Sequence, residues 1–162
     1  MTVYVNPFKG ADPCLLMKNE LLQKMEQSIE KLIQETELLT EEEFETQIIT
    51  GVWTAKDILS HVAAWDLVFV EMSTKMVNGE ELPGFSDFDQ FNAREAAKRK
   101  SHTRDDIIKE VRKNRKTYTD FLAGLTAEQL RKSGYDFTVE SLAENIMSHD
   151  RHHLQQIKSR KG

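Results

Sequence analysis

The chain has 162 residues, a length that fits one domain over residues 1–162 rather than two. Apolar residues make up 39 % and charged residues 30 %, which excludes an intrinsically disordered chain, and the net charge of −5 argues against nucleic acid or an anionic membrane as the main partner. The single cysteine, Cys14, excludes an intramolecular disulfide and a metal site built from several cysteines.

Residues 1–12 are expected to form an extended arm. Asp12 and Pro13 are a typical N-cap and first-turn pair, and the apolar residues that follow keep helical spacing to about Leu39. The first long helix is therefore expected over this stretch. The segment TEEEF at 40–44 resembles a second cap with a short turn of helix.

A second long helix is expected from a capping box of Thr54 and Asp57 to a stop at Gly79. Residues 80–86 contain proline and glycine and are expected to form a loop, followed by a shorter helical piece to about Lys100.

Thr103 and Asp106 form another capping box before a third long helix, and the last helix begins at Thr138. Strand-like alternation of useful length is not found in the sequence. Four long periodic segments predict an all-α four-helix bundle, and the long connection over residues 80–102 suggests a topology other than simple up-down-up-down.

Two sets of charged residues are interpreted as surface groups. Residues 94–116 hold 10 Lys or Arg against 4 Asp or Glu, and these charges, Arg112 and Arg115 among them, are interpreted as a solvated helix face. Nucleic-acid binding through this stretch is the less favoured alternative. Asp66 and Asp150 are likewise interpreted as solvated or paired groups at the surface.

The histidines carry the most information about chemistry. His149 and His153 are four residues apart on the apolar stripe of the last helix, so their side chains project from one face, one turn apart. With His61, beside the stripe of the second helix, they form a candidate three-histidine metal site that leaves positions open for water or substrate. The spacing alone is also compatible with hydrogen-bonded core histidines, and His152 is interpreted as a flanking group.

The segments WTAKDILSHVAAW (53–65) and HDRHHLQQI (149–157) resemble the DinB/YfiT-like superfamily of bacterial four-helix bundles. That family combines a W-[ST]-x-x-[DE]-x-x-x-H segment with a later H-x-x-x-H segment. The resemblance implies an up-down-down-up bundle, a divalent metal such as nickel or zinc on His61, His149 and His153, and frequent dimers. Characterised relatives include thiol-dependent S-transferases and hydrolases.

The leading hypothesis is a divalent-metal-dependent enzyme that activates water or a low-molecular-weight thiol for attack on a small-molecule substrate, as a hydrolase or a thiol S-transferase. The alternative is a metal-free stress or binding protein of the same fold. The sequence marks no general base, and Asp57, Asn92 and His152 are left without an assigned role.

Location and assembly are further expectations. The sequence has no run of 18 or more apolar residues, and its N-terminus has no basic segment followed by an apolar one. We therefore expect a cytoplasmic protein without a membrane span. Apolar pairs such as Leu15–Leu16 exceed what one narrow bundle face requires, which favours a homodimer.

Overall fold

The computed structural model of the chain describes residues 13–82, 84 and 87–160, so the predicted arm over residues 1–12 lies outside the described residues. The described part is mostly helical, as predicted, with two short hairpins added. Its elements in chain order are α1 (Pro13–Glu37), α2 (Glu41–Thr46), β1 (Ile48–Thr50), β2 (Trp53–Thr54), α3 (Ala55–Asn78), α4 (Phe88–Lys98), α5 (Arg104–Ala123), α6 (Ala127–Leu130), β3 (Ser133–Gly134), β4 (Phe137–Thr138) and α7 (Val139–Lys158).

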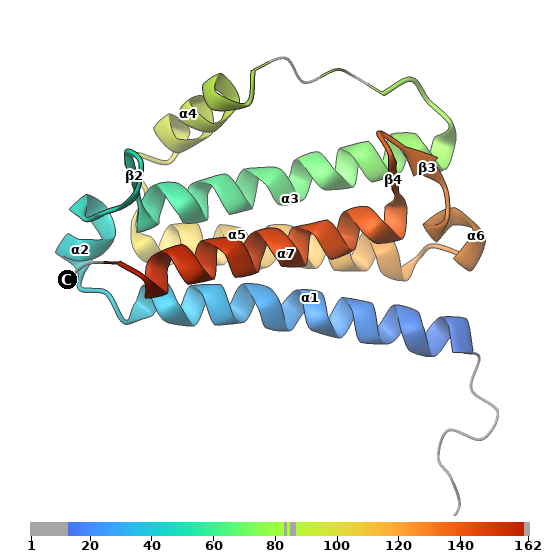
Figure 1. Ribbon diagram of the computed structural model, residues 1–162, viewed down its shortest axis with the longest axis horizontal. Coiled ribbons are helices and arrows are strands. Elements are labelled where there is room, and N and C mark those ends of the chain that lie inside the picture. The colour runs from blue at the N-terminus through green and yellow to red at the C-terminus, as the bar shows by residue number, and fades with distance from the viewer. Residues whose placement is uncertain (1–12, 83, 85–86, 161–162) are drawn as a thin grey trace, which may run out of the picture.

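The long helices α1, α3, α5 and α7 form the predicted up-down-down-up bundle (Figure 1). Helices α1 and α7 run in one direction, whereas α3 and α5 run in the other. Helix α3 packs against α5 and α7, and α1 packs against the same two helices. Because α3 and α5 are parallel, the chain between them must return along the bundle, and α4 lies on this return, against α3.

Capping boxes fix where the bundle helices that carry the candidate site begin. Thr54 Oγ1 accepts a hydrogen bond from the backbone N of Asp57 (3.3 Å), and the Asp57 carboxylate accepts one from the backbone N of Thr54 (3.0 Å). Thr138 and Ser141 form the same arrangement at the start of α7. An N-cap of this kind typically stabilises by about 0.5–2 kcal/mol, so short local sequences define both starts.

Two antiparallel hairpins, β1–β2 and β3–β4, were not expected from the sequence. Strands of two or three residues are too short to show a period-two pattern, which explains why they were missed. Each hairpin ends on a helix cap, because Thr54 and Thr138 are both the last strand residue and the N-cap of the next helix. The β1–β2 hairpin therefore lies at the N-terminal end of α3, and the β3–β4 hairpin lies at the N-terminal end of α7.

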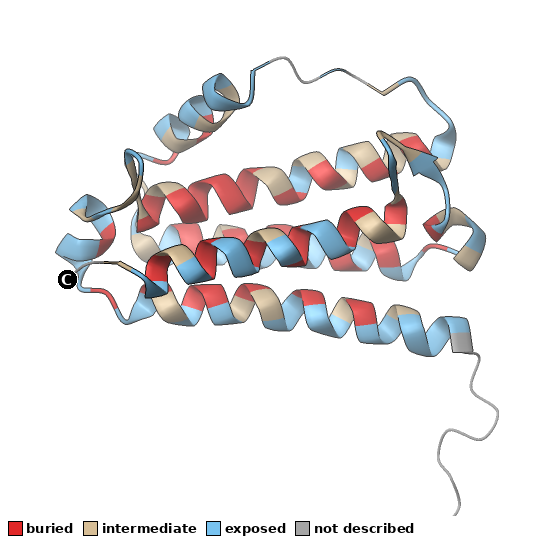
Figure 2. Cartoon of the chain, viewed as in Figure 1, coloured by how far each residue is buried: buried red, intermediate tan, exposed pale blue. Residues whose placement is uncertain are grey.

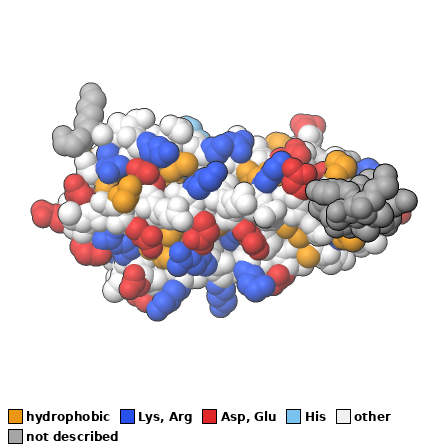
Figure 3. Space-filling model, turned by 90° about the horizontal axis from the view of Figure 1, so that it is seen from below, with side chains coloured by type: hydrophobic (Ala, Val, Ile, Leu, Met, Phe, Trp, Pro, Cys, Tyr) orange, Lys and Arg blue, Asp and Glu red, His pale blue; other side chains and the backbone are white. Residues whose placement is uncertain are grey.

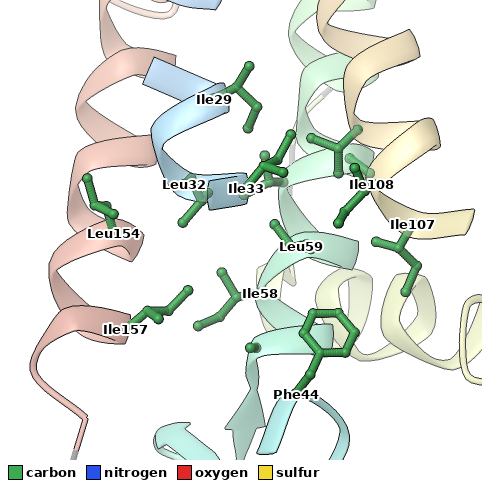
Figure 4. Packing of buried hydrophobic residues seen from close by; sticks show 14 of the residues in the cluster. Ile29, Leu32, Ile33, Phe44, Ile58, Leu59, Ile107, Ile108, Leu154 and Ile157 are labelled. Carbon is green, nitrogen blue, oxygen red and sulfur yellow. The ribbon is translucent and has the colours of Figure 1, made fainter. Parts of the chain in front are cut away.

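The buried residues lie mostly on the sides of the long helices that face one another (Figure 2), and their apolar members form two clusters. Figure 4 shows one end of this core, where α1, α2, α3, α5 and α7 all contribute side chains. The largest of them are fully buried and include Leu32, Phe44, Ile58 and Ile107. Burial of each such side chain stabilises the fold by about 1.5–3 kcal/mol, so no single contact holds the bundle together.

A buried ion triad corrects the prediction that Arg115, Asp66 and Asp150 lie at the surface. The guanidinium of Arg115 donates to Asp66 on α3 (2.8 and 3.1 Å) and to Asp150 on α7 (2.7 and 3.0 Å). Arg115 is 1 % exposed and both carboxylates are fully buried. Ser28 donates to Asp150, and the carbonyl of Met25 accepts from Arg115, so α1 joins the same network. The triad thereby links all four long helices.

The surface mixes charges of both signs. Figure 3 shows one face of the molecule, on which Lys and Arg side chains alternate with Asp and Glu rather than separating into fields of one sign. In the basic stretch 94–116, six of the ten cations form ion pairs with carboxylates, Arg115 among them. Within the described ranges, no helix is both long enough and apolar enough to cross a membrane.

Candidate metal centre

The side chains of His61, His149 and His153 meet between α3 and α7. Nε2 of His149 lies 2.7 Å from Nε2 of His61 and 3.1 Å from Nε2 of His153. One ring nitrogen of each residue lies within 4.8 Å of the others. The structure therefore brings together the three histidines that the sequence analysis selected. We call these three residues the histidine cluster.

Local and long-range features combine to build the cluster. His149 and His153 are one turn apart on α7, so a single helix face presents both rings. His61 lies on α3, which packs directly against α7, as the proposed site requires. The capping box at Thr54 sets the start of α3 two turns before His61.

Asn92 on α4 determines the orientation and the protonation of His61. Asn92 Oδ1 lies 2.9 Å from His61 Nδ1 and 2.8 Å from Trp65 Nε1. An indole N–H can only donate, so the atom of Asn92 that it meets must be the oxygen. The same oxygen accepts from His61, which puts the ring proton on Nδ1 and leaves the lone pair of Nε2 facing the other two histidines.

Gln156 plays the corresponding part for His153. Its Oε1 accepts a hydrogen bond from His153 Nδ1 (2.7 Å), and its Nε2 lies 3.1 Å from Nε2 of His152. The Nε2 lone pair of His153 is thus also directed at the cluster. His152 itself is exposed, so its ring belongs to the rim and stands outside the cluster.

Burial keeps the cluster neutral. Burial, assisted by the nearby His153, lowers the pKa of His61 to about 4, and the hydrogen bond to Asn92 opposes this only in part. Burial, with repulsion from His153 and His61, lowers the pKa of His149 to about 3. The pKa of His153 is lowered too, mainly by burial. Neutral imidazoles are the form that binds metal ions.

The donor set fits a divalent cation. With Nδ1 protonated on His61 and His153, a proton on His149 Nε2 can serve only one of its two neighbours well. A cation satisfies three converging lone pairs at once. Imidazole nitrogens around one tetrahedral ion, each about 2.0–2.1 Å from it, lie roughly 3.3 Å apart, close to the separations seen here.

The cluster opens into a cavity of about 730 Å³. Its walls come from the β1–β2 hairpin, α3, α4 and α7, and include Val52, Trp53, Asp89, Ala93, His152 and Gln156. The ring of Trp53 lies 4.9 Å from that of His61 and is stacked 6.3 Å from that of His153, centroid to centroid. A small molecule can thus reach the histidines from this cavity.

The contacts near the cluster that are local in sequence were predicted better than the distant ones. The capping-box role predicted for Asp57 is confirmed, because its carboxylate accepts hydrogen bonds from the backbone N and the Oγ1 of Thr54. Asn92 and Gln156, which orient two of the three rings, were not identified as orienting residues. Gln156 is three residues after His153 on one helix, a spacing that could have indicated the contact, whereas Asn92 is thirty-one residues from His61.

Comparisons with known proteins agree with this fold. The chain is similar to the solved structure of YfiT from Bacillus subtilis, described as a probable metal-dependent hydrolase with an unusual four-helix bundle topology, at 22 % identity and a TM-score of 0.72 over 87 % of this chain and 83 % of that one. A comparison with curated proteins gave no match. The family model of the DinB superfamily matches residues 24–157. The chain therefore belongs to the DinB superfamily.

Proposed function

We propose that the protein is a divalent-metal-dependent enzyme whose ion is held by His61, His149 and His153. The convergence of three Nε2 atoms at 2.7 and 3.1 Å carries this proposal. Nickel and zinc are the proposed ions, because imidazole ligands suit both and an all-histidine set contains no carboxylate or thiolate to favour other metals. The description of YfiT as a probable metal-dependent hydrolase supports the proposal.

Each residue of the site has a separate task. The histidine cluster supplies three neutral nitrogens from two helices, and Asn92 and Gln156 hold two of the rings by their Nδ1–H groups. An ion with three protein ligands has an open position, where it lowers the pKa of a water or a thiol and so supplies a nucleophile near neutral pH. The neighbouring cavity holds the electrophilic substrate.

Two reactions share this scheme. Water as the nucleophile gives hydrolysis, and a low-molecular-weight thiol gives transfer of the substrate's electrophilic group to sulfur. We favour hydrolysis as the first activity to test, because it is the reaction in the description of the structurally similar YfiT.

The alternative functions have less support. In a metal-free stress or binding protein, a single proton on His149 Nε2 could serve only one of the two neighbouring Nε2 lone pairs, so one buried acceptor would be left without a donor. Nucleic-acid binding through residues 94–116 is disfavoured because most of the cations in this stretch are already paired with carboxylates.

The test uses protein purified without a histidine tag, stripped with chelator and reloaded with zinc or nickel. Activity is measured on a panel of aryl esters and amides, and on a small thiol paired with an aryl halide. We expect activity in the loaded wild type and its loss in His153→Ala. The matched control is His152→Ala. His152 lies on the same helix and lines the same cavity, but it is not part of the histidine cluster. Equal activity of stripped and loaded protein would refute the proposal.

A further inference from the structure

A second cavity, of about 430 Å³, lies beside the histidine cluster. We call it the aromatic pocket. Its walls come from α3, α4, the β3–β4 hairpin and α7, and its lining includes Trp65, Phe69, Met72, Phe88, Phe137 and Leu142. None of the described residues that line it is charged. Its volume lies in the range of cavities that bind small molecules.

The aromatic pocket lies one helical turn from the histidine cluster on both α3 and α7. On α3, Trp65 follows His61 by four residues, and on α7, Asn145 precedes His149 by four residues. Both walls of the pocket are therefore one helical turn, about 5.4 Å, along the faces that carry the histidines. The ring centroids of His61 and Trp65 are 6.1 Å apart, so this side of the pocket lies next to the cluster.

The indole ring of Trp65, on the side of the pocket next to the cluster, is held in place by the same residue that orients His61. Trp65 Nε1 donates to Asn92 Oδ1, which also accepts from His61. The indole ring further contacts Phe69 and Phe91 at centroid distances of 5.9 and 5.3 Å. The pocket wall and the orientation of His61 thus depend on one shared hydrogen-bonded group, and the wall exists before any ligand binds.

Backbone strain is located at the rim of the aromatic pocket. Tyr135 lines the pocket with a φ of +51°, and Asp136 next to it has a φ of +66°. A left-handed conformation costs roughly 1–2 kcal/mol for an ordinary residue. The two-residue turn between β3 and β4 requires it, and it holds Tyr135 and Phe137 against the pocket.

We propose that the aromatic pocket binds an uncharged apolar group, aromatic or aliphatic, of a small molecule whose reacting polar end lies at the histidine cluster. This inference rests on the proposed function for the reacting end only. Rings on several sides and the absence of charge from the described lining select against charged groups, since a buried charge without a partner is costly. The substrate class is therefore an electrophile with an apolar tail or ring.

The test measures binding of the neutral fluorescent probe N-phenyl-1-naphthylamine to the full chain, with and without nickel. Asn145→Trp places an indole over the pocket from an exposed position of α7. Gln155→Trp is the matched control, because it makes the same amide-to-indole change at an exposed position of the same helix that does not line the pocket. Both variants are expected to keep wild-type helical dichroism.

We expect saturable fluorescence enhancement with wild type, Gln155→Trp and His153→Ala, and an increase of at least about tenfold in Kd with Asn145→Trp. Bound nickel should quench the probe in wild type but leave it unquenched in His153→Ala. Absence of saturable binding, or equal affinity of the two tryptophan variants, would overturn the inference whether or not the protein takes up metal. Blocked binding in Asn145→Trp with no nickel uptake by wild type would support the pocket and refute the proposed function.

Discussion

Oδ1 of Asn92 lies 2.9 Å from Nδ1 of His61, and this hydrogen bond joins the connection between α3 and α5 to the histidine cluster. The connection is long because α3 and α5 are parallel, and its helix α4 covers the part of α3 that carries His61. The up-down-down-up topology of the bundle thus supplies a residue that orients a candidate ligand.

Asn92→Ala should therefore weaken metal binding about 10–100-fold, the usual effect of removing a partner that orients a metal ligand. His61 would keep its place on α3 but lose the acceptor that holds its proton on Nδ1. Isothermal titration with zinc measures the change. Asn92→Asp, which keeps an acceptor oxygen, should restore most of the affinity. Equal affinities of Asn92→Ala and wild type would show that this contact has no positioning role.

Acid should destabilise the metal-free protein through the histidine cluster. The folded-state pKa values of His61 and His149, about 4 and about 3, lie below the ordinary value of 6.5. The unfolded chain therefore binds more protons below pH 6.5, and stability is lost as the pH falls.

Between pH 7 and pH 5 the metal-free wild type should lose about 2 kcal/mol more than His149→Gln. Urea unfolding at the two pH values measures this, and equal losses would contradict the expected burial of neutral His149. Because protons compete weakly for these rings, ion release is also expected at a pH below the ordinary histidine pKa of about 6.5.

Arg115→Met should destabilise the fold by about 3–5 kcal/mol, because it leaves Asp66 and Asp150 buried without their cation. The matched control is Lys116→Met, whose side chain is 72 % exposed and which should change stability by less than about 0.5 kcal/mol. Adding Asp66→Asn and Asp150→Asn to Arg115→Met should recover part of the loss. Similar urea midpoints for Arg115→Met and Lys116→Met would contradict the account of the triad.

A homodimer stays a prediction. Leu15, Leu16 and Met17 at the start of α1 are 48 %, 39 % and 62 % exposed, so the chain presents apolar side chains there. Light scattering at high micromolar concentration should give twice the mass of the chain. A monomeric mass under these conditions would argue against self-association.

The fold and the candidate site were most predictable where the sequence signal is local. The capping boxes at Thr54 and Thr103 mark the starts of α3 and α5, and the four-residue spacing of His149 and His153 gives a shared helix face. These features depend on residues within one or two turns of each other, so their physics can be read from a short window.

Long-range pairing was not predictable in the same way. Arg115 stands among Lys and Arg residues in the sequence, yet its partners Asp66 and Asp150 are 49 and 35 residues away. Only the packing of α5 against α3, with α7 beside it, decides that this cation is buried while Lys116 is exposed. The contact between Asn92 and His61 depends likewise on where the connection crosses the bundle.

The metal content of protein purified without a histidine tag tests the central claim most directly. After loading with zinc or nickel and removal of free ion, elemental analysis should give about one divalent ion per chain in wild type and in His152→Ala. His153→Ala should retain almost none, because loss of a ligand weakens binding by more than the roughly 10–100-fold typical of an orienting residue. The helical dichroism of His153→Ala should stay that of wild type. Equal metal content in wild type and His153→Ala would contradict the three-histidine site.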